Sequence, residues 1–222
     1  MGAGGVRGVF FDRDGTLVDS LGVVVDCYRR AIVEFEGPDR SADQIFASFS
    51  IGLARAMLSE LIGRPVGDMA VVRYESLLAD RCDEIRPYQG IRDAVARLGR
   101  SLPFTVFTAA DTSAANIIIG ATGLSPFFAS VVGADLVAST QAAPIVWSRR
   151  PVGSGWTRPR SRTSVTAHRT SPRPAPCGAL AIAAAWGHQH DPARDADLVA
   201  DAPGHLVTLL LGRAVASPAP SP

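Results

Sequence analysis

The chain contains no lysine: all 22 of its basic residues are arginine, against 21 acids in 222 residues. Its three cysteines, Cys27, Cys82 and Cys177, are scattered and match no metal-ligand spacing, a usage that fits a reducing cytoplasm. No apolar run approaches the roughly 20 residues of a membrane span. The N-terminus runs directly into a strand-like segment, which argues against a signal peptide. We therefore expect a cytoplasmic protein without a membrane partner.

Acidic residues are absent from residue 136 to residue 190. From Thr140 to Pro176 the chain has seven arginines and no acid, so this block carries +7 and the remainder −6 (15 arginines against 21 acids). Basic blocks of this size occur in nucleic-acid-binding proteins. Aromatic residues are few in the block, however, with Trp147 and Trp156 as the tryptophans, so we expect no nucleic-acid partner.

Short apolar runs alternate with segments of helical periodicity. Strands are expected at residues 5–11, 104–109, 131–136, 178–187 and 196–201. Helices are expected within residues 21–85, with breaks at 37–38 and 63–65, and at 91–98, 112–122 and 205–213. Continuous apolar strands are typical of parallel sheets covered on both faces, so the predicted fold class is α/β.

The segment Phe-Phe-Asp12-Arg-Asp14-Gly15-Thr follows the first predicted strand. Two carboxylates at i and i+2 point to the same side of an extended chain, and Gly15 then allows a tight turn. Asp12 can attack a phosphoryl group, while Asp14 can protonate the leaving group and later activate water. Two carboxylates facing a phosphate dianion need a cation, and Mg²⁺ suits oxygen ligands. An EF-hand calcium loop does not fit, because its glycine stands at position 6.

Residues 10–20 resemble motif I of the haloacid dehalogenase superfamily, in the phosphoglycolate phosphatase-like subfamily that carries a helical cap. The resemblance covers residues 5–138 and 177–213, and it implies an aspartyl-phosphate intermediate. The implied domains are a Rossmann-like core at residues 1–17 and 89–213 and an inserted α-helical cap at residues 18–88.

The same resemblance implies roles for individual residues. Asp12 would be the nucleophile and a metal ligand, and Asp14 the general acid/base and a second metal ligand through its backbone carbonyl. Thr108, at the end of the second predicted strand, matches the motif II Ser/Thr that hydrogen-bonds the phosphoryl oxygens. Ala109 and Gly15 would complete the phosphate site.

The sequence departs from the family pattern at Arg13, where the subfamily usually has an apolar residue, and more severely between residues 139 and 176. The family needs a motif III basic residue there, usually the lysine of Lys-Pro-x-Pro. It also needs a motif IV loop, Gly-Asp-x-x-x-Asp, whose carboxylate completes the metal site. Neither motif is present.

The segment from about residue 140 to residue 176 has no hydrophobic period and looks like a GC-rich gene translated in the wrong frame. Shifted codons combine the last base of each codon with the first two of the next. Over Arg162 to Pro176 they permit Tyr-Val-Gly-Asp-Ser-Ala-Pro-Asp-Leu-Ala-Ala-Ala-Arg-Ala, which is the missing motif IV with a following helix. We interpret the segment as a frameshifted translation. Resequencing the coding DNA tests this: an unchanged in-frame read would contradict a sequencing error.

If the chain is real as written, we expect residues 140–176 to be irregular and the sheet to lack the strand that carries motif IV. A disordered tail is expected at residues 214–222. The leading functional prediction is a Mg²⁺-dependent phosphohydrolase that acts on a small phosphorylated metabolite, as a monomer or homodimer. The alternative is an inactive remnant or binding protein of the same fold. A phosphomutase or a dehalogenase would share part of the framework, but a dehalogenase would not need the second acid, Asp14.

Overall fold

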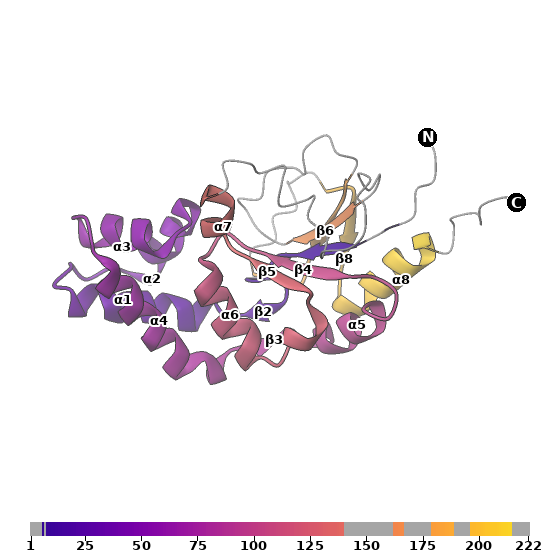
Figure 1. Cartoon of the computed structure of the whole chain (residues 1–222), viewed down its shortest axis with the longest axis horizontal. Coiled ribbons are helices and arrows are strands. Elements are labelled where there is room, and N and C mark those ends of the chain that lie inside the picture. The colour runs from indigo at the N-terminus through magenta and orange to yellow at the C-terminus, as the bar shows by residue number, and fades with distance from the viewer. Residues whose placement is uncertain (1–5, 7, 140–161, 167–178, 189–195, 215–222) are drawn as a thin grey trace, which may run out of the picture.

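A computed structural model of the chain describes residues 6, 8–139, 162–166, 179–188 and 196–214 (Figure 1). Its centre is a sheet with the strand order β5-β4-β1-β6-β7-β8, in which every neighbouring pair is parallel. The strands are β1 (Val9–Phe11), β4 (Phe104–Phe107), β5 (Ser130–Val132), β6 (Arg162–Thr166), β7 (Ala179–Ala184) and β8 (Leu198–Ala200). The predicted α/β class is confirmed, because short apolar strands assemble into a parallel sheet.

In Figure 1, α5 and α6 lie below the strands of this sheet, α8 lies to their right and α7 to their upper left. Their bounds are α5 (Ile91–Leu98), α6 (Thr112–Ala121), α7 (Ala134–Ser139) and α8 (Pro203–Ala214), and a 3-10 turn, η3, covers Ser125–Phe127. Phe11 meets Phe104 and Phe128 edge-on, with ring centroids 5.2 and 5.8 Å apart. This aromatic cluster fixes β1, the strand that leads into the acidic loop.

The strand predicted at residues 131–136 is shorter than expected, because the chain turns at Gly133. Asp135 Oδ1 accepts hydrogen bonds from both Thr112 N (2.8 Å) and Thr112 Oγ1 (2.7 Å), and Thr112 Oγ1 accepts one from Gly133 N (3.0 Å). A Cβ at Gly133 would stand 2.4 Å from Thr112 N, so only glycine fits this approach. The strand therefore ends at Val132, and α7 begins at Ala134.

The expectation that the sheet would lack a strand between β1 and β7 was wrong. Strand β6, Arg162–Thr166, pairs with both neighbours, with Val9 opposite Thr163 and Phe11 opposite Val165. The alternation Thr-Ser-Val-Thr contains β-branched residues, which suit a strand whatever reading frame produced them. The remainder of residues 140–176, and the predicted tail beyond Ala214, lie outside the described residues.

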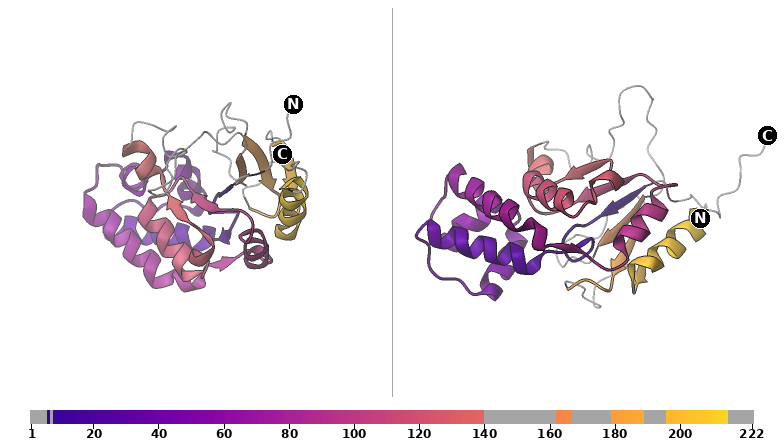
Figure 2. Two further views of the ribbon diagram at one scale, coloured as in Figure 1. Left: turned by 45° about the vertical axis from the view of Figure 1, so that its right-hand side comes forward. Right: turned by 90° about the horizontal axis from the view of Figure 1, so that it is seen from below.

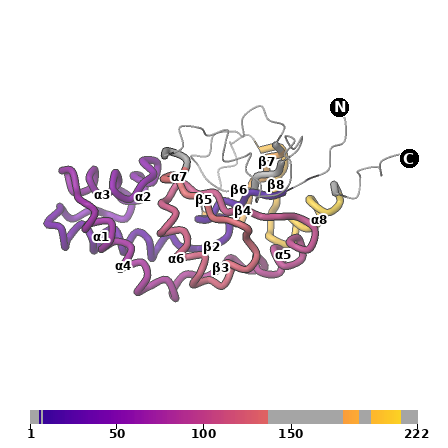
Figure 3. Tube along the Cα trace, in the orientation of Figure 1, coloured from indigo at the N-terminus to yellow at the C-terminus, as the bar shows by residue number. Residues whose placement is uncertain are grey.

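Between β1 and β4 the chain forms a helical unit, defined here as α1–α4. It comprises α1 (Leu21–Glu34), α2 (Ala42–Ala47), the 3-10 turn η1 (Ser48–Ile51), α3 (Ala54–Ile62), α4 (Asp68–Arg81) and the 3-10 turn η2 (Cys82–Glu84). Both views of Figure 2 show these helices gathered at one end of the molecule. The chain enters the unit through β2 (Val18–Asp19) and leaves it through β3 (Arg86–Pro87), which pair antiparallel and lie together in Figure 3. None of the helices in the described ranges is both long and apolar enough to cross a membrane.

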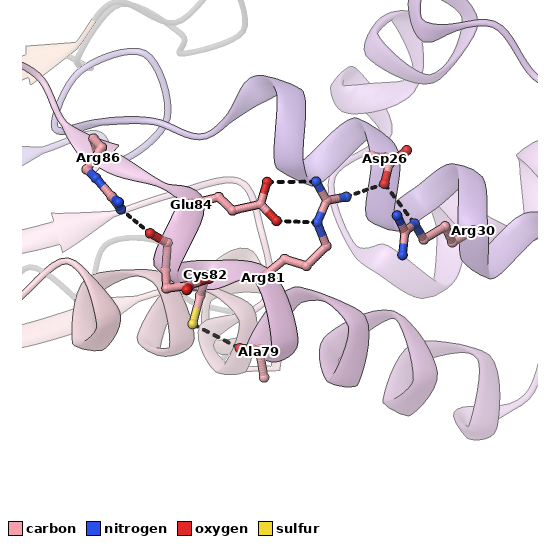
Figure 4. A network of polar contacts seen from close by, with 8 residues as sticks. Asp26, Arg30, Ala79, Arg81, Cys82, Glu84 and Arg86 are labelled. Carbon is pink, nitrogen blue, oxygen red and sulfur yellow. Dashed lines mark hydrogen bonds and ion pairs between the residues drawn. The ribbon is translucent and has the colours of Figure 1, made fainter.

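An ion-pair network joins α1 to the end of α4, shortly before the chain leaves the helical unit through β3 (Figure 4). Arg81 donates to both carboxylate oxygens of Glu84, at 2.7 and 2.8 Å, and also pairs with Asp26. Asp26 in turn accepts from Arg30 at 2.8 Å. These side chains are partly exposed, and such pairs contribute little individually. The network serves mainly to orient α4 against α1 where the chain returns to the sheet.

Candidate active site

The predicted site residues meet at the carboxyl edge of the sheet. Asp12 follows β1 and Thr108 follows β4, and the register that pairs Phe11 with Val106 places the two strand ends side by side. Ligands of open α/β sheets bind at this edge. The structure therefore brings Asp12 and Thr108 together from positions almost a hundred residues apart in the sequence.

The loop after β1 is a tight turn organised around one carbonyl. Arg13 O accepts backbone hydrogen bonds from Thr16 (3.3 Å), Leu17 (2.9 Å) and Val18 (3.2 Å). Gly15 has φ +72° and donates from its backbone N–H to Val18 O at 3.1 Å. A left-handed φ at a buried position favours glycine, so the turn explains Gly15 independently of any ligand.

The two carboxylates of the loop have different surroundings. Asp12 Oδ1 accepts from Arg13 N at 2.8 Å. The Asp14 carboxylate accepts from Ser20 Oγ at 2.5 Å and from the Arg13 guanidinium, with Nε 3.0 Å from each oxygen and Nη2 2.6 Å from Oδ2. Asp14 is 17% exposed and the Arg13 side chain 2%. Asp14 is thus held in one orientation beside the nucleophile candidate.

Arg13 is the one buried charged side chain in the part of the chain that the structure describes. Burial alone would lower the pKa of its guanidinium, but the ion pair and hydrogen bonds with Asp14 outweigh it and leave the pKa raised. Arg13 was not among the predicted site residues. The signal that could have found it was the arginine in a place where the subfamily usually has an apolar residue.

Thr108, the motif II residue after β4, is buried. Its backbone N–H donates to Val132 O at 3.0 Å, and its Oγ1 accepts from Ala110 N at 3.3 Å. Ala109 is exposed, and a Cβ at Gly52 would lie 3.6 Å from Ala109 O. The loop between η1 and α3 therefore approaches the predicted phosphate-binding segment at Ala109.

Asp111 links this segment to the helical unit. Its Oδ2 accepts from Ala54 N at 2.7 Å, at the first residue of α3. Asp111 stands at the N-cap of α6, yet its side chain makes no capping bond to that helix. The Asp111 carboxylate instead accepts the hydrogen bond from the first residue of α3, whose backbone N–H has no partner within its own helix. A second contact, from Ser113 Oγ to Glu75, joins α6 to α4.

Asp111→Ala is expected to lower the free energy of unfolding by about 1 kcal/mol, because the bond to Ala54 N is lost without a local replacement. For a chain of this length the melting temperature should fall by about 2–4 °C. Asp111→Asn keeps an acceptor oxygen and should lose less. Thermal unfolding followed by circular dichroism compares the two variants; equal losses would show that the carboxylate geometry is not what holds α3.

Two stacked tyrosines lie inside the helical unit, near the acidic loop. Tyr28 of α1 and Tyr74 of α4 have stacked rings with centroids 4.1 Å apart. Burial raises the pKa of both phenols, and Tyr74 also interacts electrostatically with Arg13 and Asp14. The tyrosines were missed at the level of the sequence, where they read only as apolar positions of two helices.

The far side of the loop is held by the chain after β7. Trp186 Nε1 donates to Thr16 O at 3.0 Å, and Tyr88 Oη lies 2.8 Å from His188 Nδ1. These contacts join the end of β7 to the acidic loop and to the residue after β3. Trp186 belongs to residues 177–213, over which the sequence resembles the family, and the structure places it in contact with the loop.

No group of three or more His, Cys, Asp or Glu side chains that could hold a metal occurs among the residues described. Asp12 and Asp14 lie in the same loop, but Arg13 and Ser20 occupy much of the Asp14 carboxylate. Mg²⁺ is commonly held by one or two carboxylates, substrate phosphate and water. The Asp12 carboxylate and the Asp14 backbone carbonyl fit such a partial site, and no further acid of the described residues forms a metal-binding group with them.

Comparison with known proteins places this architecture. The family model of haloacid dehalogenase-like hydrolases matches residues 6–148. A protein described as probable phosphatase IndB, from Dickeya dadantii, is 28% identical over 144 residues, which cover 61% of this chain and only 62% of that relative.

Two solved structures show the same fold at low sequence identity. CbbY from Rhodobacter sphaeroides, in complex with phosphate, has a TM-score of 0.71 at 15% identity, over 90% of this chain and 96% of that one. A predicted phosphoglycolate phosphatase from Haemophilus somnus has a TM-score of 0.67 at 15% identity, over 94% and 99% of the two chains.

Proposed function

Because the chain belongs to the haloacid dehalogenase-like hydrolases, we propose that it is a phosphohydrolase of a small phosphorylated metabolite, with Asp12 as its nucleophile. The observation that carries the proposal is the pair of carboxylates after β1, set beside buried Thr108 at the carboxyl edge of the sheet. The α1–α4 unit would act as a cap, since its η1–α3 loop lies against Ala109. Closure of such a unit excludes water from the reacting groups.

In the first half-reaction, Asp12 attacks phosphorus and the ester bond to the leaving oxygen breaks. Asp14 gives its proton to that oxygen, which leaves an aspartyl-phosphate and a free alcohol. In the second half-reaction Asp14 takes a proton from water, and the water oxygen attacks phosphorus. The bond to Asp12 breaks, and inorganic phosphate is released.

Thr108 and the neighbouring backbone would hold the phosphoryl oxygens during both steps, together with Ala109 and Gly15. Asp12 and the backbone carbonyl of Asp14 would hold Mg²⁺, which offsets the negative charge of the phosphoryl group when bound. Arg13 and Ser20 keep the Asp14 carboxylate in a single orientation, so that little reorganisation is needed at the moment of proton transfer.

Removal of divalent metal is expected to abolish turnover of p-nitrophenyl phosphate, and added Mg²⁺ should restore it. Because the described ligands are one carboxylate and one carbonyl, we expect saturation only at millimolar Mg²⁺. Initial rates after treatment with EDTA, followed by titration with Mg²⁺, measure both effects. Hydrolysis that is unaffected by EDTA would contradict the proposed metal site.

The second candidate is a protein of this fold without turnover. It is favoured by the lack of any acid between residues 136 and 190, where the family places its motif IV carboxylate. The same assay separates the two functions: a folded chain that binds phosphate but shows no metal-dependent hydrolysis would support the second.

A further inference from the structure

Arg13 is a buried cation for which the proposed reaction has only a supporting role. Its side chain is 2% exposed, whereas the other arginines within the described ranges are partly or fully exposed wherever their burial is given. It lies between Asp12 and Asp14 in the sequence and is bonded to the Asp14 carboxylate through Nε and Nη2. A buried charge is costly unless an opposite charge and hydrogen bonds compensate it, or unless it binds a ligand.

The compensation is incomplete. Nη1 of Arg13 is buried and has no hydrogen-bond partner. A buried donor left without an acceptor is destabilising, and more so when it belongs to a charged group. An apolar residue would avoid this cost altogether. Arg13 therefore keeps one unpaired N–H donor group on the same guanidinium that is bonded to the Asp14 carboxylate.

The surroundings of the guanidinium indicate which kind of ligand it can take. Asp14 accounts for one negative charge, and the hydroxyl of Tyr74 lies near enough to interact electrostatically with the cation. A phosphoryl dianion bound at Asp12 brings two further negative charges to the same place. The chain has no lysine to meet them, and the guanidinium of Arg13 is already bonded to the Asp14 carboxylate at this place.

We propose that Arg13 is an anion-binding residue of the active site, whose Nη1 donates to an oxygen of the phosphoryl group bound beside Asp12. Nε and Nη2 stay on Asp14, so one planar guanidinium links the acid/base carboxylate to the bound phosphoryl group. Arginine suits this arrangement because its donors form a rigid fork. This inference rests on the proposed function for the identity of the anion, but it concerns binding and is testable without turnover.

The test is the affinity for inorganic phosphate at fixed Mg²⁺, measured by isothermal titration calorimetry. Arg13→Leu should weaken phosphate binding by about 10- to 100-fold, the range for a hydrogen bond to a charged group. Arg13→Lys keeps the charge but not the fork, and should recover part of the loss. Arg97→Leu removes an exposed arginine of α5 and should leave the affinity unchanged.

Removing Arg13 alone also leaves the Asp14 carboxylate uncompensated, and this charge could repel phosphate by itself. The comparison of Asp14→Asn with the double variant Arg13→Leu/Asp14→Asn removes that effect. A further loss of at least about 10-fold in the double variant supports direct binding by Arg13. Equal phosphate affinity in these two variants, each shown to be folded by circular dichroism, would overturn the inference.

The outcome is independent of catalysis. If the wild-type chain shows no hydrolysis but the affinities follow the expected order, the anion site stands and the proposed activity fails. If hydrolysis is present but loss of Arg13 leaves phosphate binding unchanged, the activity stands and Arg13 serves only to hold Asp14.

Discussion

Asp12→Asn is expected to reduce metal-dependent hydrolysis of p-nitrophenyl phosphate by at least about 10³-fold, which corresponds to about 4 kcal/mol in the barrier. The amide is nearly isosteric with the carboxylate but is a poor nucleophile, and it also weakens the metal site. Its Oδ1 can still accept the hydrogen bond from Arg13 N. The loop should therefore keep its fold, and the loss should appear in kcat.

Asp19→Asn provides a matched control. Asp19 lies in β2, the short strand that follows the acidic loop, and its side chain is 65% exposed. We expect turnover within about threefold of wild type, as for surface substitutions with small energetic effects. Steady-state kinetics of both variants, with melting temperatures to verify folding, make the comparison. An Asp12→Asn protein with undiminished turnover would remove Asp12 from the mechanism.

The predicted elements that proved accurate are those fixed by local sequence. The helix expected at residues 91–98 occupies these residues, and the strand before Asp12 lies in the centre of the sheet, because apolar periodicity and flanking glycines are local signals. The membership of the family is confirmed by the match over residues 6–148. Gly133 shows the limit of this approach: the end of β5 depends on Thr112 and Asp135, which the sequence keeps apart.

The site was predicted only where a motif is continuous in the sequence. Asp12, Asp14 and Gly15 lie in one run, and Thr108 follows an apolar strand. Their catalytic and binding roles stay predictions. Other polar contacts, such as the bond from Ala54 N to Asp111, depend on how the helical unit meets the sheet. No pattern within one segment encodes such a contact, so sequence analysis could not find it.

Strand β6 gives the reading-frame interpretation a structural consequence. Phe11 lies opposite Val165, so the next position on each strand places Thr166 in register with Asp12. The shifted codons permit Tyr-Val-Gly-Asp over residues 163–166, and their aspartate falls at this position. Neighbouring strands are about 4.8 Å apart. A carboxylate introduced at residue 166 would therefore stand at the end of the strand beside the nucleophile.

Replacing residues 163–176 with the shifted-frame sequence is expected to raise kcat/KM for p-nitrophenyl phosphate by about 10²- to 10³-fold, the usual scale for one preorganised electrostatic group. Half-saturation should move to lower Mg²⁺ concentrations, because a second carboxylate joins the site. The single substitution Thr166→Asp should produce part of the change in Mg²⁺ affinity. Initial rates across a Mg²⁺ titration measure both quantities for each protein.

The decisive control is the replaced segment with threonine retained at position 166. It keeps the new strand and helix but not the carboxylate beside Asp12, so it separates repair of the fold from repair of the metal site. If this control is as active as the full replacement, the gain comes from packing, and the metal argument is wrong. If neither protein has a higher kcat/KM than the original chain, the shifted sequence does not belong to this fold. The seven arginines between Thr140 and Pro176 then require another explanation. A gain that depends on the carboxylate would instead show that Asp12 and Asp14 belong to a site whose missing ligand lies in the adjacent strand.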